Sequence, residues 1–244
     1  MNDQKEKQTH KIMVIGAHAG DAEIMAGAVV AKYTQAGHQA VLVHLTPGEK
    51  GHHTMTPEDY AKQKIEEGDR AAEKLGAQAI FLAYRDAELP LNDQVKYQVA
   101  DLIRAEKPNI IITHWKGSIH KDHEYTHYIV QDAIFYAALP AIKRELPAHA
   151  CYTQFFAENW EDPYDFEIDT YVDISDSYQQ WLTAVQEYQL FAGGISSFRY
   201  LDYYQALAKL RGCLAHSQYA VGLMRPKGAK IARGNSLPGK ELLV

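Results

Sequence analysis

The stretch that most constrains this chain is an apolar run that ends in polar, ligand-capable side chains, residues 12–23 (IMVIGAHAGDAE). The run is short, rich in β-branched residues and followed by glycine, which predicts a buried strand. The next segment, 23–36, predicts a helix that stops at Gly37. His18 and Asp21 therefore lie in a strand-to-helix turn, at the edge of a parallel sheet where ligands bind. A histidine and a carboxylate at this spacing can both point at one cation.

The alternation of apolar run and helical segment continues along the chain. Strands are predicted at 40–46, 79–83, 109–113, 151–157 and 170–174, and helices at 56–76, from Asn92 or Asp93 onward, 123–138, 176–191 and 200–214. This order is typical of an α/β fold with a doubly wound, mostly parallel Rossmann-like sheet and helices on both faces. The tail from Arg225 is basic and rich in glycine and proline, which predicts an irregular segment.

Two loops of this sheet are predicted to converge. The loops after the first and fourth strands face each other across the switch point when those strands are adjacent. The first loop supplies His18 and Asp21, and the second supplies a denser set: His120, Asp122, His123 and, one helical turn later, His127. Two histidines and one carboxylate with open coordination positions are typical of catalytic zinc, and ferrous iron suits the same ligands.

These motifs resemble those of the LmbE-like, PIG-L-type zinc-dependent N-deacetylases, which act on N-acetylglucosamine derivatives. That family has His-Pro-Asp-Asp-x-Glu after strand one and His-Pro-Asp-His after strand four, where this chain has HAGDAE at 18–23 and HKDH at 120–123. The likeness extends to LTPGEKG at 45–51, Lys64, Glu67, Asp86 and 108–113, and loosely to 172–174. The resemblance implies a single domain over 1–244, an LmbE-like three-layer sandwich with its core half at 11–140 and a completing half at 141–244.

The resemblance also implies roles for individual residues. Zinc is expected on His18, Asp21 and His123, with His120 as the acid, or as the cation that stabilises the tetrahedral intermediate, and Asp122 orienting it. Lys64 stands where the family usually has an arginine that contacts substrate. Glu49 and His127 are also expected to contact the substrate. Alone, each residue also has an ordinary structural explanation: Asp21 as a helix cap, His120 as a surface loop residue, and Lys64 as a solvated helix lysine.

One position departs from the family pattern. The first aspartate of the family pair, taken as the general base, is Gly20 here, and glycine cannot accept a proton. Three explanations stay open at this point. His120, backed by Asp122, serves as both base and acid; another carboxylate, Glu23 or Glu49, reaches the water; or the protein binds metal and ligand without efficient hydrolysis.

Composition excludes several other classes. The net charge of −6 and a pI near 6.0 argue against a general nucleic-acid binder. Two cysteines suggest no disulfide framework, and the polar first eleven residues do not suggest a signal peptide, so a cytoplasmic protein is expected. No window approaches the length of a membrane span. The first turn lacks Gly-x-Gly-x-x-Gly, and no Gly-x-Ser-x-Gly occurs, which argues against a dinucleotide site and a serine hydrolase.

The sequence thus predicts a zinc-dependent amidohydrolase that removes an acyl group, most simply acetyl, from an N-acylated amino-sugar conjugate. The alternative is a metal- and ligand-binding relative with weak or no deacetylase activity, because of Gly20. The expected partner is a small molecule, with no nucleic acid and no membrane. A homo-oligomer is compatible with the sequence, which leaves the subunit count open.

Overall fold

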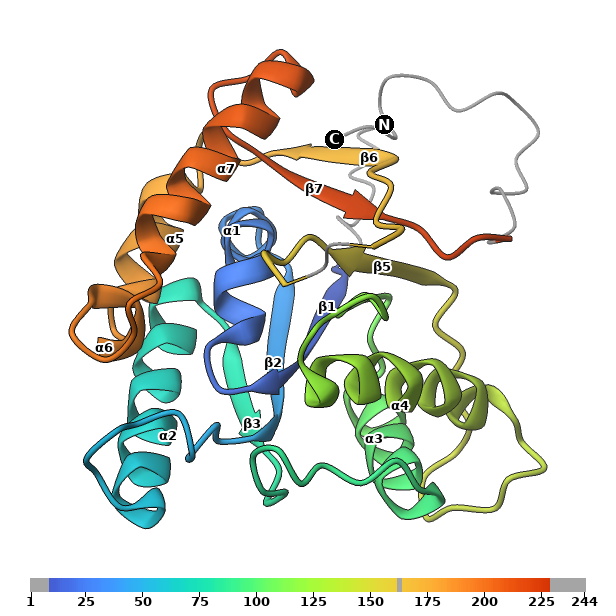
Figure 1. Cartoon of the computed structure of the whole chain (residues 1–244). Coiled ribbons are helices and arrows are strands. Elements are labelled where there is room, and N and C mark those ends of the chain that lie inside the picture. The colour runs from blue at the N-terminus through green and yellow to red at the C-terminus, as the bar shows by residue number, and fades with distance from the viewer. Residues whose placement is uncertain (1–8, 162–163, 229–244) are drawn as a thin grey trace, which may run out of the picture.

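The computed structural model describes residues 9–161 and 164–228, which form three layers around one sheet (Figure 1). The strands are β1 (Lys11–His18), β2 (Gln39–Thr46), β3 (Gln78–Phe81), β4 (Ile110–Thr113), β5 (Thr153–Ala157), β6 (Thr170–Asp173) and β7 (Ala220–Met224). The helices are α1 (Asp21–Gln35), α2 (Pro57–Leu75), α3 (Asp93–Glu106), α4 (Lys121–Ala138), α5 (Tyr178–Val185), α6 (Gln189–Ala192) and α7 (Tyr200–Ala215).

The sheet has the order β3-β2-β1-β4-β5-β7-β6. It is parallel from β3 to β5, and β1 lies between β2 and β4, which confirms the predicted α/β fold and the predicted adjacency of the first and fourth strands. Strand β7, which no sequence pattern predicts, runs antiparallel to both of its neighbours. Strands from the second half of the chain thus extend the same sheet as those from the first half.

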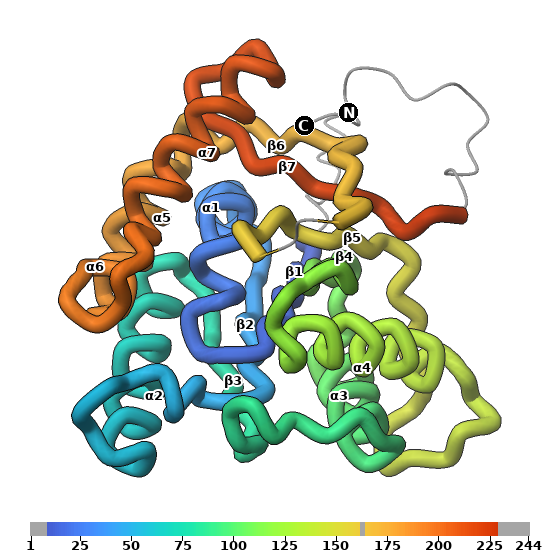
Figure 2. Tube along the Cα trace, in the orientation of Figure 1, coloured from blue at the N-terminus to red at the C-terminus, as the bar shows by residue number. Residues whose placement is uncertain are grey.

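Helices cover both faces of the sheet, as predicted. Side chains of β1 alternate between two cores, so that Ile12 and Val14 pack on one face and Met13 and Ile15 on the other. The first core lies under α1, α2, α5 and α7, and the second under α3 and α4 (Figures 1 and 2). A strand buried on both faces is expected to be continuously apolar, which explains the run at the start of the chain. No helix in the described part of the chain is long and apolar enough to cross a membrane.

Some segments differ from the predicted ones. The single helix predicted over 176–191 is two helices, α5 and α6, with a break at 186–188. Helix α4 begins at Lys121, earlier than predicted, because the ring of His120 accepts a hydrogen bond from the backbone N–H of Asp122 and caps the helix. Most of the irregular tail predicted from Arg225, residues 229–244, lies outside the described residues, as do residues 1–8.

A buried arginine fixes the far end of α4. Arg104 of α3 is 2% exposed and donates to five backbone carbonyls at the end of α4 and in the loop that follows. Carbonyls in the last turn of a helix have no partner within the helix, so the guanidinium satisfies them directly. The contact anchors the helix whose opposite end bears His120 and His123.

We expect Arg104→Met to lower the free energy of unfolding by about 3 kcal/mol, because several buried carbonyls lose their donor at once. Urea unfolding followed by circular dichroism measures this change. Arg144→Met is the matched control, since Arg144 binds Asp101 at the surface and its loss should barely move the transition. Equal effects of the two substitutions would contradict the anchoring role of Arg104.

Candidate functional site

Three side chains from two distant segments meet beyond the carboxyl ends of β1 and β4. His18 ends β1, Asp21 begins α1 and His123 lies in the first turn of α4. The atoms His18 Nδ1, Asp21 Oδ2 and His123 Nε2, here called the donor triangle, lie 3.2 Å apart in every pair. A tetrahedral ion with ligands at about 2.0–2.1 Å keeps its ligand atoms roughly 3.3 Å apart. The triangle therefore has the dimensions of one face of a tetrahedral metal site.

The outward nitrogens of both imidazoles face carboxylates. His18 Nε2 lies 3.2 Å from Asp86 Oδ1 and 3.5 Å from Asp122 Oδ2. His123 Nδ1 lies 3.0 Å from Glu161 Oε2. A carboxylate beside the outer nitrogen is the usual environment of a metal-binding histidine, because it keeps the proton on that nitrogen and leaves the other lone pair free. The chemistry of these donors therefore fits a cation such as zinc or ferrous iron.

The charges around the triangle favour a positive charge at its centre. Burial acts to lower the pKa of both rings, but for His18 the Asp21 charge and contacts with Asp122 and Asp86 raise the pKa well above its ordinary value. For His123, Asp21 and Glu161 likewise outweigh burial and raise the pKa to about 9. Burial raises the pKa of Asp21, yet His123 and His18 hold it well below the usual range. Metal binding releases such protons, so a divalent ion can replace them.

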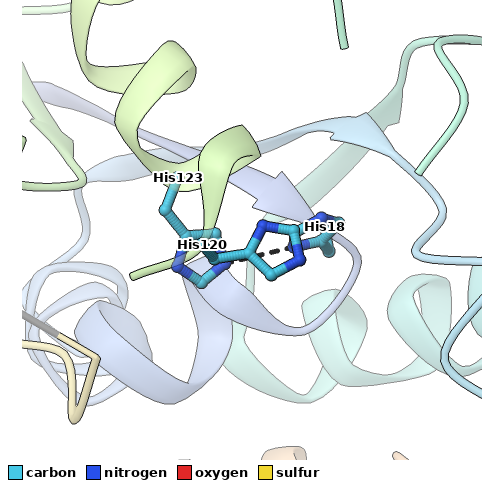
Figure 3. A group of neighbouring side chains, drawn as sticks. All are labelled: His18, His120 and His123. Atoms are coloured by element: carbon cyan, nitrogen blue, oxygen red, sulfur yellow. Dashed lines mark hydrogen bonds between the residues drawn. The ribbon is translucent and has the colours of Figure 1, made fainter. Parts of the chain in front are cut away.

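His120 lies against both rings of the triangle (Figure 3). Its ring centroid is 4.7 Å from that of His18 and 4.9 Å from that of His123. The backbone N–H of Asp122 donates to His120 Nδ1 over 3.2 Å, so the neutral ring has its proton on Nε2 and acts as a donor there. Burial and the nearby His18 and His123 lower the pKa of His120, which favours this neutral form.

The predicted pairing of the Asp122 carboxylate with His120 is wrong. Asp122 is fully buried, and its Oδ2 accepts a hydrogen bond from the backbone N–H of Ala87 over 2.7 Å. The same oxygen faces His18 Nε2. Among the described contacts, only the backbone N–H of Asp122 bonds to the His120 side chain. Asp122 therefore supports His18, not His120.

The triangle and His120 open into a cavity of about 330 Å³. This volume is in the range of small-molecule sites. One wall comes from the first half of the chain and includes Gly48, Tyr60, Lys64 and Asp86; the other comes from the second half and includes Trp160, Glu161, Phe191, Ile195 and Tyr200. The second wall contains the aromatic rings of Trp160, Phe191 and Tyr200, which suit the apolar faces of a ring-shaped ligand.

Lys64 is a buried cation at this cavity. The residue is 2% exposed, and its Nζ lies 4.8 Å from the ring centroid of Tyr188 and 5.8 Å from that of Phe191. No carboxylate of the described residues forms an ion pair with it. The predicted substrate contact of Lys64 stays a prediction, and the placement of its ammonium group is compatible with it.

The backbone and packing at Gly20 leave no room for a side chain. Gly20 has φ +107°, a conformation that other residues rarely adopt. A Cβ there would lie 2.8 Å from Phe191 Cζ and 3.5 Å from Lys64 Nζ. The ring of Phe191 therefore fills the space that a carboxylate at this position would need.

Two predicted substrate contacts lie outside the cavity. The Glu49 carboxylate accepts hydrogen bonds from the backbone N–H of Asp86 at 3.0 and 3.2 Å, so it holds the loop that bears Asp86. His127 Nδ1 donates to the carbonyl of His114 over 3.0 Å, and its ring packs against Trp115 and Phe156. Neither residue is among the described residues that line the cavity, so both predictions are corrected to supporting roles.

Glu23, one of the carboxylates considered as a replacement base, is also committed elsewhere. It is fully buried, accepts a hydrogen bond from the Tyr188 hydroxyl over 2.9 Å and lies 3.3 Å from His44 Nε2. The cavity lining does not include it. Both carboxylates considered as replacement bases are thus engaged in other contacts, Glu23 with Tyr188 and Glu49 with the backbone of Asp86.

His114, to which the sequence motifs give no role, contacts two residues of the donor triangle, Asp21 and His123. The residue is fully buried, its Nε2 accepts a hydrogen bond from the backbone N–H of Ala17 over 3.1 Å, and the same atom lies 3.3 Å from Asp21 Oδ2. Its ring stacks on His123 with centroids 4.2 Å apart. The position of His114 directly after β4, next to β1 in the sheet, is the signal that could have revealed it.

Comparison with known proteins gives two similar relatives along most of the chain. A diacetylchitobiose deacetylase of Thermococcus kodakarensis is 27% identical over 87% of this chain and 82% of the relative. A 4-oxalmesaconate hydratase of Pseudomonas putida is 25% identical over 91% of this chain and 86% of the relative. The two names describe different reactions, so likeness alone does not select one.

The fold also matches solved structures. The structure of GalB, the 4-carboxy-2-hydroxymuconate hydratase of Pseudomonas putida KT2440, superposes with a TM-score of 0.83 and 22% identity, covering 93% of this chain and all of that one. The family model described as PIG-L, GlcNAc-PI de-N-acetylase, matches residues 13–134, half of the chain, and this stretch includes the donor triangle and His120. Because this match covers half of the chain, the chain belongs to the PIG-L family.

Proposed function

We propose that this protein is a zinc-dependent N-deacetylase that acts on an N-acetylated amino-sugar conjugate. The observation that supports it most is the donor triangle, in which two imidazole nitrogens and one carboxylate oxygen lie 3.2 Å apart and all three residues line a cavity. The family and the relative named as a diacetylchitobiose deacetylase support the reaction class. Ferrous iron suits the same donors, so metal identity is part of the test.

In this proposal His18, Asp21 and His123 hold the ion, which when bound acidifies water and polarises an acyl carbonyl. Asp86 and Asp122 keep the His18 ring in the binding tautomer. His120 donates from Nε2 to the acyl oxygen or to the leaving nitrogen, because its Nδ1 is occupied by the Asp122 N–H. The aromatic wall at Trp160 holds the sugar ring.

The test combines metal analysis with an amine-release assay. Purified protein should contain close to one zinc or iron per chain and should release a primary amine from N-acetylglucosamine conjugates. Stripping the metal with a chelator should abolish release, and adding back zinc should restore it. Metal-replete protein that releases no amine from any N-acetylated sugar would refute the deacetylase proposal while leaving the metal site in place.

We expect His120→Ala to lower kcat about 10²-fold, since one positioned donor to the developing charge is lost. Metal content should not change, because His120 Nδ1 caps α4 and its ring contributes no atom to the donor triangle. His52→Ala is the control: His52 lies in a loop at the same sheet edge but does not line the cavity. Loss of metal in His120→Ala would contradict the assigned role.

A hydratase is the second candidate, favoured by two observations. Residue 20 bears no carboxylate, and Lys64 offers a buried ammonium without a carboxylate partner among the described residues. A substrate with carboxylate groups would satisfy that cation, and a relative is named as a hydratase. Water addition to an unsaturated dicarboxylate can be measured as a loss of ultraviolet absorbance. This assay distinguishes hydratase activity from amine release.

A further inference from the structure

The metal-binding role proposed for His123 depends on which of its two ring nitrogens bears the proton. A neutral imidazole has one N–H, and the nitrogen that bears the proton cannot bind a metal. His123 must therefore keep its proton on Nδ1 if Nε2 is to face the ion. Some neighbour has to favour that tautomer, and the neighbours of Nδ1 come from outside α4.

We propose that Glu161 is the positioning residue that holds the proton of His123 on Nδ1 and thereby prepares Nε2 for the metal. Glu161 Oε2 lies 3.0 Å from His123 Nδ1, and its side chain is 12% exposed. The inference rests on the proposed metal site, but not on the identity of the substrate. It adds a residue from beyond the stretch that matches the family model.

Of the two other polar neighbours of Nδ1, the Ser118 hydroxyl is a weaker acceptor and the Asn159 NH₂ group is a donor. Ser118 Oγ lies 3.3 Å from it, but this hydroxyl also accepts from the backbone N–H of His120 and lies 3.5 Å from Glu161 Oε2. Asn159 Nδ2 lies 3.4 Å away, and the Asn159 oxygen accepts from the Tyr204 hydroxyl, so its NH₂ group is turned toward His123. The NH₂ group of an asparagine donates hydrogen bonds and cannot accept one from the imidazole N–H. Among the described residues, Glu161 alone brings a negative charge to within 4 Å of this nitrogen.

The backbone places Glu161 where the role requires it. Its carbonyl accepts a hydrogen bond from the backbone N–H of Ile119 over 3.2 Å, in the loop between β4 and α4. The segment after β5 is thus tied to the loop that leads into His120 and His123. The arrangement at His123 parallels that at His18, where Asp86 and Asp122 face the outer nitrogen.

The test measures metal affinity, which does not depend on the reaction. We expect Glu161→Gln to weaken zinc binding about 10–100-fold, the usual cost of losing a carboxylate behind a ligating histidine. Competition with a chromophoric chelator gives the zinc dissociation constant, and the visible spectrum of the cobalt-loaded protein reports the geometry. Glu124→Gln is the matched control, because it removes the same charge from α4 beside His123 and should leave the affinity unchanged.

The possible outcomes separate the proposed metal site from the role of Glu161. A wild-type protein that binds neither zinc nor cobalt would overturn the proposed function and this inference together. Tight binding by both wild type and Glu161→Gln would overturn only the role of Glu161. If Glu161→Gln does not fold, nitrogen-15 NMR of the metal-free wild type, at a pH where the His123 ring is neutral, decides: the inference requires the proton on Nδ1, and a proton on Nε2 overturns it.

Discussion

Replacing His18 with alanine should empty the metal site and reduce turnover by about 10³-fold or more. Loss of a residue that hydrogen-bonds to a metal ligand lowers metal affinity or activity about 10–100-fold, and loss of the ligand itself should have a larger effect. His18 contributes Nδ1 to the donor triangle, and its Nε2 engages Asp86 and Asp122. The measurement is metal content after gel filtration, together with the rate of amine release.

His52→Ala is again the matched control, since it removes a histidine from the same sheet edge without touching the triangle. It should retain its metal and its rate. Circular dichroism establishes whether both variants remain folded. A folded His18→Ala protein that keeps a full complement of metal would show that the triangle is not the binding site.

The second large effect that we expect is an increase in turnover. Gly20→Asp alone should not increase turnover, because a Cβ there would lie 2.8 Å from Phe191 Cζ and the backbone has φ +107°. Gly20→Asp combined with Phe191→Ala removes the clash with the ring, and aspartate is one of the residues that adopt positive φ more readily than most. We expect this double variant to raise kcat about 10²-fold, the lower end of the contribution of a general base, with metal content unchanged.

The matched control for this gain is Gly20→Asn with Phe191→Ala, which has the same shape but cannot accept the proton. Phe191→Ala alone shows the cost of opening the wall. Equal rates for the aspartate and asparagine double variants would mean that the natural chain already has an effective proton acceptor. In that case the absence of a carboxylate at residue 20 does not limit the rate of the reaction.

Much of the fold could be predicted from the sequence because its central strands are buried on both faces. A run such as that of β1 is apolar throughout, and its period and length separate it from the helices around it. Strand β7 escaped prediction because its pairing depends on contacts with β5 and β6, which lie far away in the sequence. The break between α5 and α6 likewise has no strong local signal, since no proline or glycine interrupts 176–191.

The site was predictable where a residue lies in a strand-to-helix connection. His18 ends β1, Asp21 begins α1, and His123 lies in the first turn of α4, the helix after β4, so the topology brings them to one edge of the sheet. The remaining partners depend on which way a side chain turns. His127 is one turn from His123, yet it packs against Trp115 and Phe156 outside the cavity. Glu161 lies in an irregular segment after β5, where no periodicity indicates a direction.

The second wall of the cavity, which includes Phe191, Ile195 and Tyr200, contributes no atom to the donor triangle and lies beyond the stretch matched by the family model. In the proposed function, substitutions at Phe191, Ile195 or Tyr200 should therefore change which ligand fits the cavity while the three donor atoms keep their positions.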